Sequence, residues 1–564
     1  MLGKAAVSAI SVILVVGVAL AIVGVVQHQS SSKSDSASEN QISTQQKAVS
    51  VFCGKTDYQE ICQKTLTPVA DQGVKDPKEF VKAALQSTIN EVSKALNFSD
   101  TLITNVSSST PRVKMEAEDC KDLLEFAVDE LQSSFSMVGD SNINNMTDKA
   151  TEIKNWLSAV ISYQTSCLDG LSEAPEFQSL MGKNLQNASS LTSNALAIVS
   201  ELGAILKAYG LELNVKPSSG SRRLLGEDGY PTWFSASDRK LLAASPGTFR
   251  PNAVVAKDGS GQYKTISAAL AAYPKNLRGR YIIYVKAGVY NEYITVTKNQ
   301  KNVFIYGDGP RKTIVTGNKS NKGGFSTFKT ASFSAVGQGF IAKSMGFTNT
   351  AGPEGHQAVA LRVQSDMAVI YNCRMDAYQD TLYIQAHRQF YRNCVISGTV
   401  DFIFGDSATI IQNCLIIVRK PLDNQKNTVT AHGRADKREI TALVIHNSRI
   451  VPERKLFPVR FKIPTYLGRP WKEYARTVIM ETTLADFVNP EGYLPWAGDF
   501  GLATCSYFEY GNRGPGANFR GRVKWKNVRV IGRSEALQFT VNSFIQGNYW
   551  LKTTGTPYLP ALKI

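Results

Sequence analysis

Apolar residues in the first part of the chain recur at the spacing of amphipathic helices. In residues 76–99, Leu85, Ile89, Val92 and Leu96 follow at i, i+4, i+7 and i+11 and so lie on one helical face. Comparable stripes run through residues 120–135, 152–171 and 187–206. Four such helices with short connections predict an up-and-down bundle over residues 50–212. We recognise no catalytic constellation within it.

The pattern changes from residue 250 onwards, where short β-branched segments alternate with Gly, Asn and Asp turns. Many short strands indicate a pair of sandwiches, a propeller or a solenoid. A sequence repeat distinguishes between these folds. Asn372, Asn393 and Asn413 each precede a cysteine and recur after 21 and 20 residues, and Asn349 and Asn447 lie on either side of them. Side chains at such spacing stack from coil to coil in a parallel β-helix. We therefore predict an all-α four-helix bundle followed by an all-β right-handed parallel β-helix over residues 244–564.

Four polar residues share the spacing of this repeat. Asp380 precedes Asp401 by 21 residues, and Gln357 precedes Gln379 by 22. Since neighbouring coils lie about 4.8 Å apart, we expect these side chains to form one stack. Two stacked carboxylates repel each other, so one of them is driven towards its protonated form. A neutral acid beside an ionised nucleophile suits acyl or glycosyl transfer.

The stretch "GTVDFIFG", residues 398–405, reads as a strand that contains a carboxylate. Alternation with a period of two predicts Val400, Phe402 and Phe404 on one side, and Asp401 with Ile403 on the other. A half-buried carboxylate in a strand requires a compensating partner.

Arg469, in "YLGRPW", is the expected partner of Asp401. Its planar guanidinium can hold a carboxylate through two hydrogen bonds, and Trp471 beside it offers a stacking surface for a sugar ring. The alternative is an ion-pair cluster of Asp380, Asp401 and Arg469 without chemistry. Two glutamines in the same stack favour the chemical interpretation.

The net charge divides the chain into two units. Residues 1–243 carry 21 Lys and Arg against 27 Asp and Glu, a net charge of −6, whereas residues 244–564 carry 42 against 20, a net charge of +22. The second unit is therefore suited to an acidic partner, such as nucleic acid, an anionic membrane or an acidic polysaccharide.

The N-terminus indicates entry into the secretory pathway. Residues 5–26 carry no charge, a length that favours a signal anchor over a signal peptide, although a long signal peptide within residues 1–26 stays open. Residues 27–49 form a polar linker. Five N-glycosylation sequons agree with secretion, at Asn97, Asn105, Asn145, Asn187 and Asn318.

Eight cysteines in an oxidising compartment can pair. Cys53 and Cys62 are close enough to close a short hairpin, which leaves Cys120 with Cys167, one of three possible connectivities. Stacked coils bring Cys373, Cys394 and Cys414 into a column. Both a Cys373–Cys394 disulfide and a column of free thiols fit this arrangement.

Residues 213–243 read as a linker with processing sites. The tetrapeptide RRLL ends at Leu225 and RKLL ends at Leu242, within a Pro-, Gly- and Ser-rich stretch. Paired basic residues in an exposed linker favour cleavage by a processing protease. The alternative is an ordinary linker.

Five motifs in order resemble the plant pectin methylesterases over roughly residues 250–560: "GVYNE", "HQAVAL", "YQDTLY", "GTVDFIFG" and "YLGRPW". The preceding bundle, with its four cysteines, resembles the pectin methylesterase inhibitor domain that many plant members carry as a pro region. The resemblance implies a secreted enzyme, anchored as a precursor if the N-terminus is kept, that removes methyl esters from cell-wall pectin. Inhibitor-like proteins are further expected partners.

The resemblance also implies roles for individual residues. Asp401 is the expected nucleophile and Asp380 the proton donor, while Gln357 and Gln379 stabilise the oxyanion. Arg469 orients Asp401, and Arg469, Trp471 and Gln357 contact substrate, with Thr327 at a further substrate-contact position. We expect no cofactor, because the five histidines show no metal-ligand spacing.

Two other functions remain as alternatives. A β-helical polygalacturonase needs two carboxylates flanking a glycosidic bond, and a pectate lyase needs Ca²⁺ ligands and a base, whereas the glutamine pair suits an oxyanion. A wall lectin or nucleic-acid binder would not need Asp380, Asp401 and Arg469 together. We therefore expect pectin, and no nucleic acid, as the partner, and contact with a membrane only through the N-terminal anchor.

Overall fold

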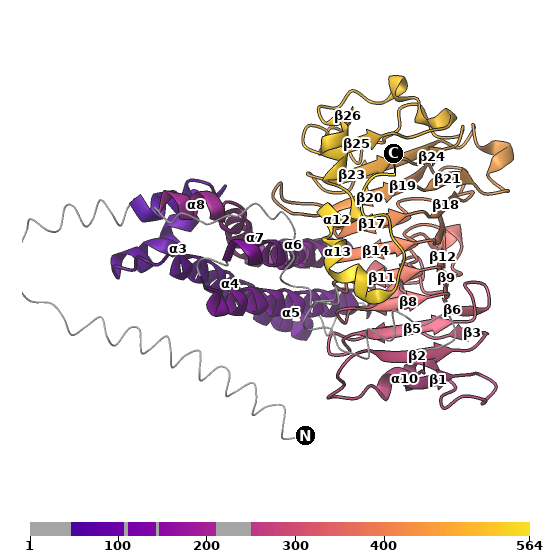
Figure 1. Cartoon of the computed structure of the whole chain (residues 1–564), viewed down its shortest axis with the longest axis horizontal. Coiled ribbons are helices and arrows are strands. Elements are labelled where there is room, and N and C mark those ends of the chain that lie inside the picture. The colour runs from indigo at the N-terminus through magenta and orange to yellow at the C-terminus, as the bar shows by residue number, and fades with distance from the viewer. Residues whose placement is uncertain (1–46, 106–110, 143–145, 210–249, 564) are drawn as a thin grey trace, which may run out of the picture.

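The computed structural model describes residues 47–105, 111–142, 146–209 and 250–563. These residues form a helical bundle that lies against the flank of a long stack of parallel strands (Figure 1). Several predicted features lie outside the described residues: the N-terminal segment 1–26, most of the predicted linker 27–49, the processing sites expected at Leu225 and Leu242, and the sequon residue Asn145. The side chain of Asn105 also lies outside them.

Four long helices make up the described part of the bundle, with shorter helices at its far end, among them a helix over residues 47–53 (Figure 1). The remaining helices are α3 (Gln59–Asp71), α4 (Pro77–Asn105), α5 (Pro111–Asp140), α6 (Met146–Gly170), α7 (Pro175–Ser200) and α8 (Leu202–Ala208). Their apolar faces bury Leu85, Val92, Leu124 and Leu157 in one core. The prediction of one continuous helix over residues 187–206 was wrong, because α7 ends at Ser200 and α8 continues at an angle of 66°.

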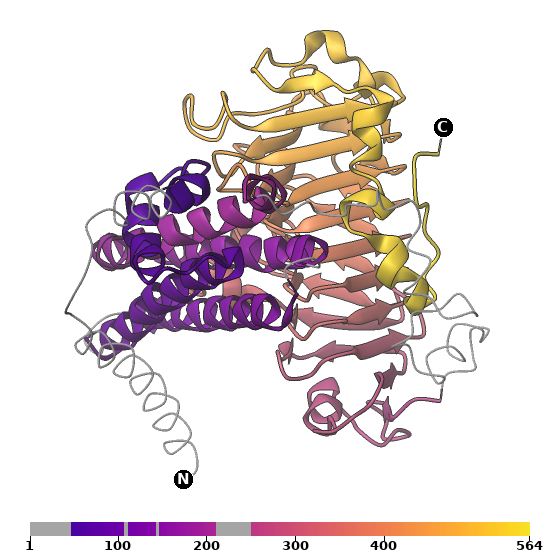
Figure 2. The same ribbon diagram turned by 60° about the vertical axis from the view of Figure 1, so that its left-hand side comes forward.

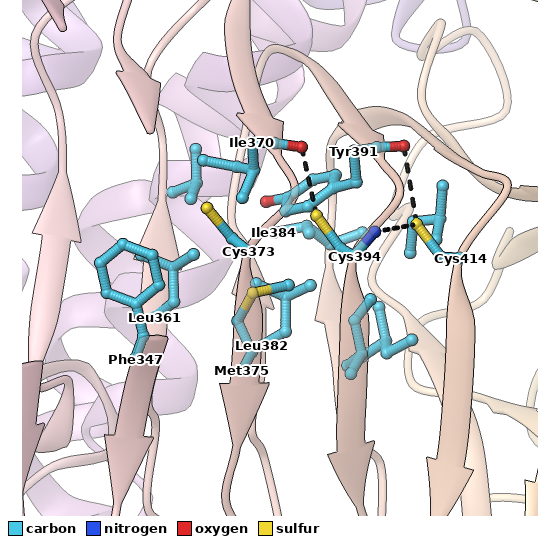
Figure 3. Close-up of a cluster of buried hydrophobic side chains, with 14 of the residues drawn as sticks. Phe347, Leu361, Ile370, Cys373, Met375, Leu382, Ile384, Tyr391, Cys394 and Cys414 are labelled. Atoms are coloured by element: carbon cyan, nitrogen blue, oxygen red, sulfur yellow. Dashed lines mark hydrogen bonds between the residues drawn. The ribbon is translucent and has the colours of Figure 1, made fainter. Parts of the chain in front are cut away.

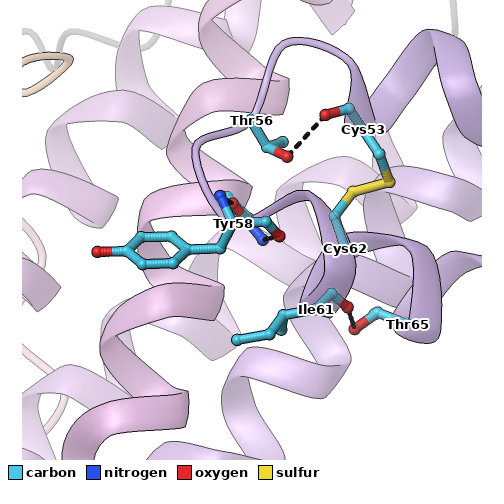
Figure 4. Close-up of a disulfide and its surroundings, with 7 residues drawn as sticks. Cys53, Thr56, Tyr58, Ile61, Cys62 and Thr65 are labelled. Atoms are coloured by element: carbon cyan, nitrogen blue, oxygen red, sulfur yellow. Dashed lines mark hydrogen bonds between the residues drawn. A yellow bond between two sulfur atoms is a disulfide. The ribbon is translucent and has the colours of Figure 1, made fainter.

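Two disulfides brace the bundle. Cys53 is bonded to Cys62, which closes the turn before α3, and Cys120 on α5 is bonded to Cys167 on α6. Figure 4 shows the first of these beside Thr56, whose hydroxyl donates to the Cys53 carbonyl oxygen at 2.8 Å. The second fixes α5 to α6, the two helices nearest the strands in Figure 1.

The remaining residues form a parallel β-helix of three sheets (Figures 1 and 2). Sheet 1 contains β1 (Ala253–Val255), β2 (Tyr281–Val285), β5 (Val303–Gly307), β8 (Ile341–Lys343), β11 (Ala368–Tyr371), β14 (Arg388–Arg392), β17 (Ala408–Gln412), β20 (Ala442–His446), β23 (Arg476–Met480), β25 (Ser506–Tyr510) and β26 (Val528–Val530). Sheet 2 contains β3 (Gly288–Asn291), β6 (Thr313–Gly317), β9 (Gly346–Asn349), β12 (Arg374–Asp376), β15 (Val395–Gly398), β18 (Leu415–Val418), β21 (Arg449–Pro452) and β24 (Thr483–Leu484). Sheet 3 contains β4 (Ile294–Val296), β7 (Phe333–Ala335), β10 (Leu361–Val363), β13 (Leu382–Ile384), β16 (Ile403–Gly405), β19 (Asn427–His432) and β22 (Thr465–Pro470).

The length of a coil matches the sequence repeat in the middle of the β-helix, in all three sheets. In sheet 3, Leu361 pairs with Leu382, and Leu382 pairs with Ile403, at the same interval that separates the two aspartates. The next pair along the sheet, Ile403 with Thr430, spans a longer coil. The additional residues form longer connections between sheets, so the repeat read from the sequence holds best for the coils that carry Asp380 and Asp401.

An asparagine ladder follows the corner between sheet 1 and sheet 2. Asn413 Nδ2 donates to Asn393 Oδ1 at 2.7 Å, and Asn447 Nδ2 donates to Asn413 Oδ1 at 3.2 Å. These residues have positive φ angles, which asparagine tolerates better than most residues. Assigning Asn349 to this ladder was wrong, because it ends β9 and is buried. Its coil supplies Ser344 instead, which accepts from Asn372 at 2.9 Å.

The cysteines that follow the ladder point into the β-helix core. Figure 3 shows Cys373, Cys394 and Cys414 side by side among buried apolar side chains. All three are free thiols, so the structure contains the thiol column rather than a Cys373–Cys394 disulfide. The Cys394 amide donates to Cys414 Sγ at 3.3 Å.

The outer face of sheet 1 is covered by the C-terminal segment. Helices α11 (Arg533–Leu537), α12 (Val541–Phe544) and α13 (Gly547–Trp550) cross the strands (Figure 2) and bury Val541 and Trp550 against the sheet. At the opposite end, α10 (Ile266–Ala271) packs beside β1. Taken singly, none of the described helices has the length and apolar character of a membrane span, although the bent pair α7 and α8 passes that test jointly.

Candidate active site

The two aspartates lie at the corner between sheet 2 and sheet 3, directly before consecutive strands. Asp380 precedes β13 and Asp401 precedes β16, and the Asp380 amide donates to the Val400 carbonyl oxygen at 3.1 Å. The parallel register of these strands places Asp380 and Asp401 at equivalent positions on adjacent coils.

The strand predicted for residues 398–405 was wrong in its middle. Asp401 has a φ of 48° and Asp380 a φ of 63°, so both adopt the left-handed conformation of a bend. The bend breaks the alternation, because Phe402 and Ile403 both enter the core while Phe404 points away from it. Aspartate tolerates this conformation better than most residues, which explains how a carboxylate fits here without disrupting a strand.

Asp401 is held by two neighbours. Arg469, on β22, donates through Nε to Oδ1 at 2.9 Å and through Nη2 to Oδ2 at 2.6 Å. The Thr428 hydroxyl donates to Oδ1 at 2.6 Å and accepts from the Asp401 amide at 2.8 Å. Sequence reasoning missed Thr428, because the coil that joins it to Asp401 is longer than the regular repeat.

Asp380 has a different environment. Burial raises the pKa of Asp380 well above its usual range, and the neighbouring charge of Asp401 raises it further, while Arg469 acts in the opposite direction. Its side chain accepts no hydrogen bond from the described residues, whereas Asp401 accepts several. The arrangement therefore places a carboxyl group whose protonated form is favoured, Asp380, beside a side chain that is ion-paired with Arg469, Asp401.

These groups face a cavity of about 660 Å³ between the β-helix and the bundle. Gln357 and Gln379 also line it, and the Ala358 amide donates to the Gln379 carbonyl oxygen at 3.2 Å, which keeps the two glutamines on adjacent coils. Thr327, in the 3₁₀ helix η3 (Thr327–Thr330), and Trp471 complete the set expected from the sequence. The structure thus brings all seven candidate residues into one cavity: Asp380, Asp401, Gln357, Gln379, Arg469, Thr327 and Trp471.

A row of aromatic side chains in this cavity was not expected. Tyr383 and Phe404 stack with ring centroids 4.3 Å apart, and Trp471 meets Phe404 edge-on at 5.9 Å. Trp496 lies 4.3 Å from the Arg469 guanidinium. Tyr383 and Phe404 occupy the same place after their stacked aspartates, so the interval that located the carboxylates also predicts this pair. Such a surface suits the apolar faces of sugar rings.

The bundle covers this cavity from the outside. The Ser166 hydroxyl on α6 lies 3.2 Å from the Tyr383 hydroxyl, and Ser162 donates to the Gln385 carbonyl oxygen at 2.8 Å. Tyr163 is buried at the same interface, 3.2 Å from His387 Nε2. Bundle residues therefore form one wall of the space that a substrate would enter.

The remaining candidate sites lie elsewhere. Among the sequon asparagines, Asn97, Asn187 and Asn318 are exposed. Within the described ranges, no cluster of three or more His, Cys, Asp or Glu side chains could hold a metal ion.

Comparisons with known proteins match both parts of the chain. Residues 252–548 match the family described as Pectinesterase, and residues 47–198 match Plant invertase/pectin methylesterase inhibitor. The chain is 44% identical over 559 residues to Putative pectinesterase/pectinesterase inhibitor 28 of Arabidopsis thaliana, covering 98% of this chain and 74% of that protein. It is 41% identical over 597 residues to Pectinesterase 4 of Arabidopsis thaliana, covering 99% of each. Among solved structures, Pectin methylesterase from Carrot matches with a TM-score of 0.56 and 50% identity over 56% of this chain and 100% of that one.

Proposed function

Because the chain belongs to the pectinesterase family and carries an inhibitor-like helical domain, we propose that it cleaves methyl esters of galacturonate units in pectin through a covalent intermediate on Asp401. The observation that carries this proposal is the pairing of two stacked aspartates with unequal environments. Asp401 is fixed as a carboxylate by Arg469, and Asp380 is buried beside it with a raised pKa.

In the first half of the reaction, an Asp401 carboxylate oxygen attacks the ester carbonyl carbon at C6 of galacturonate. The carbonyl oxygen gains negative charge, and the side-chain amides of Gln357 and Gln379 donate hydrogen bonds to it. One such donor contributes about 10²–10³ in rate. As the tetrahedral intermediate collapses, Asp380 gives its proton to the methoxy oxygen, methanol leaves, and a mixed anhydride joins galacturonate to Asp401.

In the second half, Asp380 is a carboxylate and takes a proton from an incoming water molecule. The resulting hydroxide attacks the galacturonyl carbon of the anhydride, and the bond to Asp401 breaks. The galacturonyl unit is released as a carboxylic acid, which then loses its proton to solvent, while Asp401 is regenerated as a carboxylate and Asp380 is protonated again. Arg469 holds the Asp401 oxygens in the same orientation through both halves.

The replacement Asp401→Asn tests the nucleophile. It preserves shape and replaces the nucleophilic carboxylate by a neutral amide, so methanol release from methylated pectin should fall below a few per cent while folding and pectin binding persist. The assay also separates the alternatives, since a hydrolase releases reducing ends and a lyase releases unsaturated ends. Activity near that of the parent chain would contradict the assignment.

The bundle, residues 50–212, is a pro region that inhibits the β-helix domain, residues 244–564, or controls its export. Its helices line the cavity and contact Tyr383 through Ser166. A processing protease cutting after Leu225 or Leu242, in the linker 213–243, would free the domain. A specific cleavage site placed in this linker allows the test, because methanol release should rise after cutting and separation. Equal activity of the cut and uncut chains would remove the inhibitory role.

The protein acts in the plant cell wall after secretion, either from an anchored precursor or after removal of residues 1–26. Glycans on the sequon asparagines Asn97, Asn105, Asn145, Asn187 and Asn318 fit this route. The net charge of +22 on residues 244–564 attracts de-esterified, polyanionic pectin, so added salt should weaken wall binding.

A further inference from the structure

The ion pairs between the bundle and the β-helix all have the same polarity. Eight pairs join the described residues of the two parts; in each the bundle supplies the carboxylate, and the β-helix supplies a Lys or Arg cation in seven pairs and the side chain of His387 in the eighth. The carboxylates belong to Asp57, Asp119, Asp122, Asp129, Glu130, Glu152 and Asp169, and their partners are Lys298, Lys329, His387, Arg388, Lys437, Arg438 and Lys472. In electrostatic terms, the bundle therefore binds the β-helix as a polyanion does.

Two of these carboxylates line the cavity that holds Asp380 and Asp401. Asp119, on α5, lies 2.9 Å from Lys329 Nζ and accepts from the Ser326 hydroxyl at 2.5 Å. Asp169, on α6, lies 2.5 Å from Lys472 Nζ. At the first position, the β-helix can therefore bind a carboxylate through the Ser326 hydroxyl and the Lys329 ammonium group. At the second, it can bind one through the Lys472 ammonium group, next to Trp471.

The two positions lie an equal number of coils from the aspartate pair, at opposite ends of the strands of sheet 3. Lys329 lies in η3, ahead of β7, and Lys472 lies two residues after the end of β22, while Asp380 and Asp401 precede β13 and β16, which lie two strands in from β7 and β22. Five steps between strands, at about 4.8 Å each, separate the coils of the two lysines by about 24 Å along the axis. A carbohydrate chain crossing the aspartates would therefore pass one cation on each side.

We propose that Lys329, with Ser326, and Lys472 bind the free carboxylates of galacturonate units that neighbour the unit being de-esterified, and that Asp119 and Asp169 occupy these positions in the uncut chain. The proposal rests on the proposed function and adds a substrate preference to it. A galacturonan chain that already carries free carboxylates beside a methyl ester places an anion at each lysine. A fully esterified chain leaves both cations unpaired.

The same positions explain how the bundle can be displaced. Once the linker is cut, the bundle is held only by non-covalent contacts, and de-esterified galacturonan competes for Lys329 and Lys472. The product of the reaction would then release the inhibitory domain. Fully methylated chains lack the charge to do so.

The substrate preference can be measured on the chain cut in the linker and freed of the bundle by salt. Two galacturonate oligomers of equal length are compared, one fully esterified and one with free carboxylates around a single methyl ester. The ratio of kcat/KM for the acid-flanked over the esterified oligomer should exceed one. It should fall by about fivefold in Lys329→Gln and in Lys472→Gln, the effect of one ion pair at the upper end of exposed values.

Lys298→Gln is the matched control. Lys298 also pairs with a bundle carboxylate, but its partner Asp129 does not line the cavity, unlike Asp119 and Asp169, so the ratio should stay at its parental value. A ratio of one in the parent chain, or an equal fall in Lys298→Gln, would overturn the proposal. Absence of methanol release from both oligomers would instead refute the proposed function.

Displacement gives a second readout that does not depend on turnover. The cut chain is immobilised through its β-helix domain and washed with de-esterified oligomer, with esterified oligomer or with NaCl at matched ionic strength. The de-esterified oligomer should release the bundle at the lowest concentration. Equal release by all three washes would show that general screening, rather than occupancy of the two lysine positions, dissociates the bundle.

Discussion

Replacing Arg469 tests whether the two aspartates have different roles, Asp401 as the nucleophile and Asp380 as the proton donor. Arg469 donates to both oxygens of Asp401, at 2.9 and 2.6 Å, and the Asp401 side chain is 7% exposed. In Arg469→Ala the carboxylate loses its counter-ion, and the proton is no longer directed to Asp380 alone. Removing one partner of a buried pair costs about 3–5 kcal/mol.

Because the Arg469 side chain is 22% exposed, the lower end of this range applies. A loss of about 3 kcal/mol of transition-state stabilisation corresponds to a fall of about 10² in kcat. Arg469→Lys keeps the positive charge but loses the bidentate hydrogen bonding to Asp401, so we expect a smaller fall in kcat, of about tenfold.

The assay is methanol release from methylated pectin by the cut chain, with kcat and KM determined separately and folding checked by circular dichroism. Arg460→Ala is the matched control, because Arg460 also pairs with an aspartate, Asp486, but lies away from the cavity. Its kcat should equal that of the parent chain. A folded Arg469→Ala that keeps more than a tenth of the parental kcat would refute the reasoning.

Three further predictions concern pH and stability. Asp380 must be protonated to release methanol, so kcat/KM should fall as pH rises through the raised pKa of Asp380. Because Arg469 lowers the Asp380 pKa, this fall in kcat/KM should occur at higher pH in Arg469→Ala. A fall at lower pH in that variant would contradict the prediction. In the docked state, burial raises the pKa of Asp119 and Asp169, and Glu130 raises that of His387 against the effect of burial. The contribution of these three groups to docking is therefore largest below the ordinary values of 3.8 and 6.5, whereas Asp57, whose pKa Arg438 lowers to about 2, contributes fully only above 3.8. Above 3.8, where the Asp57 contribution is constant, retention of the cut bundle should weaken as pH rises through the raised values, and tighter retention at higher pH would refute this sign. Finally, Asn413→Ala should lower the thermal unfolding midpoint more than Asn413→Gly does. Both variants lose the ladder hydrogen bonds, but only glycine tolerates the φ of 58° at this position. Equal midpoints in the two variants would argue against backbone strain.

The sequence was sufficient to predict the two folds and the residues that gather in the cavity. The helical stripes identified the bundle, and the recurring asparagines identified the β-helix. The regular interval placed Asp380 and Asp401 on adjacent coils because the coils of that region have no insertions. The relative position of the two aspartates could be predicted because it depends on this register.

Features that depend on coils of other lengths were not predictable in this way. Thr428 and Arg469 both contact Asp401 from beyond the longer coil, so only chemistry, and no spacing, pointed to Arg469. The bend at Asp401 was missed because a period of two assumes extended backbone, whereas a β-helix turns a corner every few residues. The position of the bundle over the cavity depends on contacts such as Ser166 to Tyr383, which no local pattern contains.

Rapid acid quenching of the cut chain during turnover, followed by peptide mapping, tests whether Asp401 forms the covalent intermediate. We expect a galacturonyl mass on the peptide that contains Asp401, and no such mass in Asp401→Asn. The same mass on Asp380, or on no residue while methanol is being released, would contradict this role of Asp401.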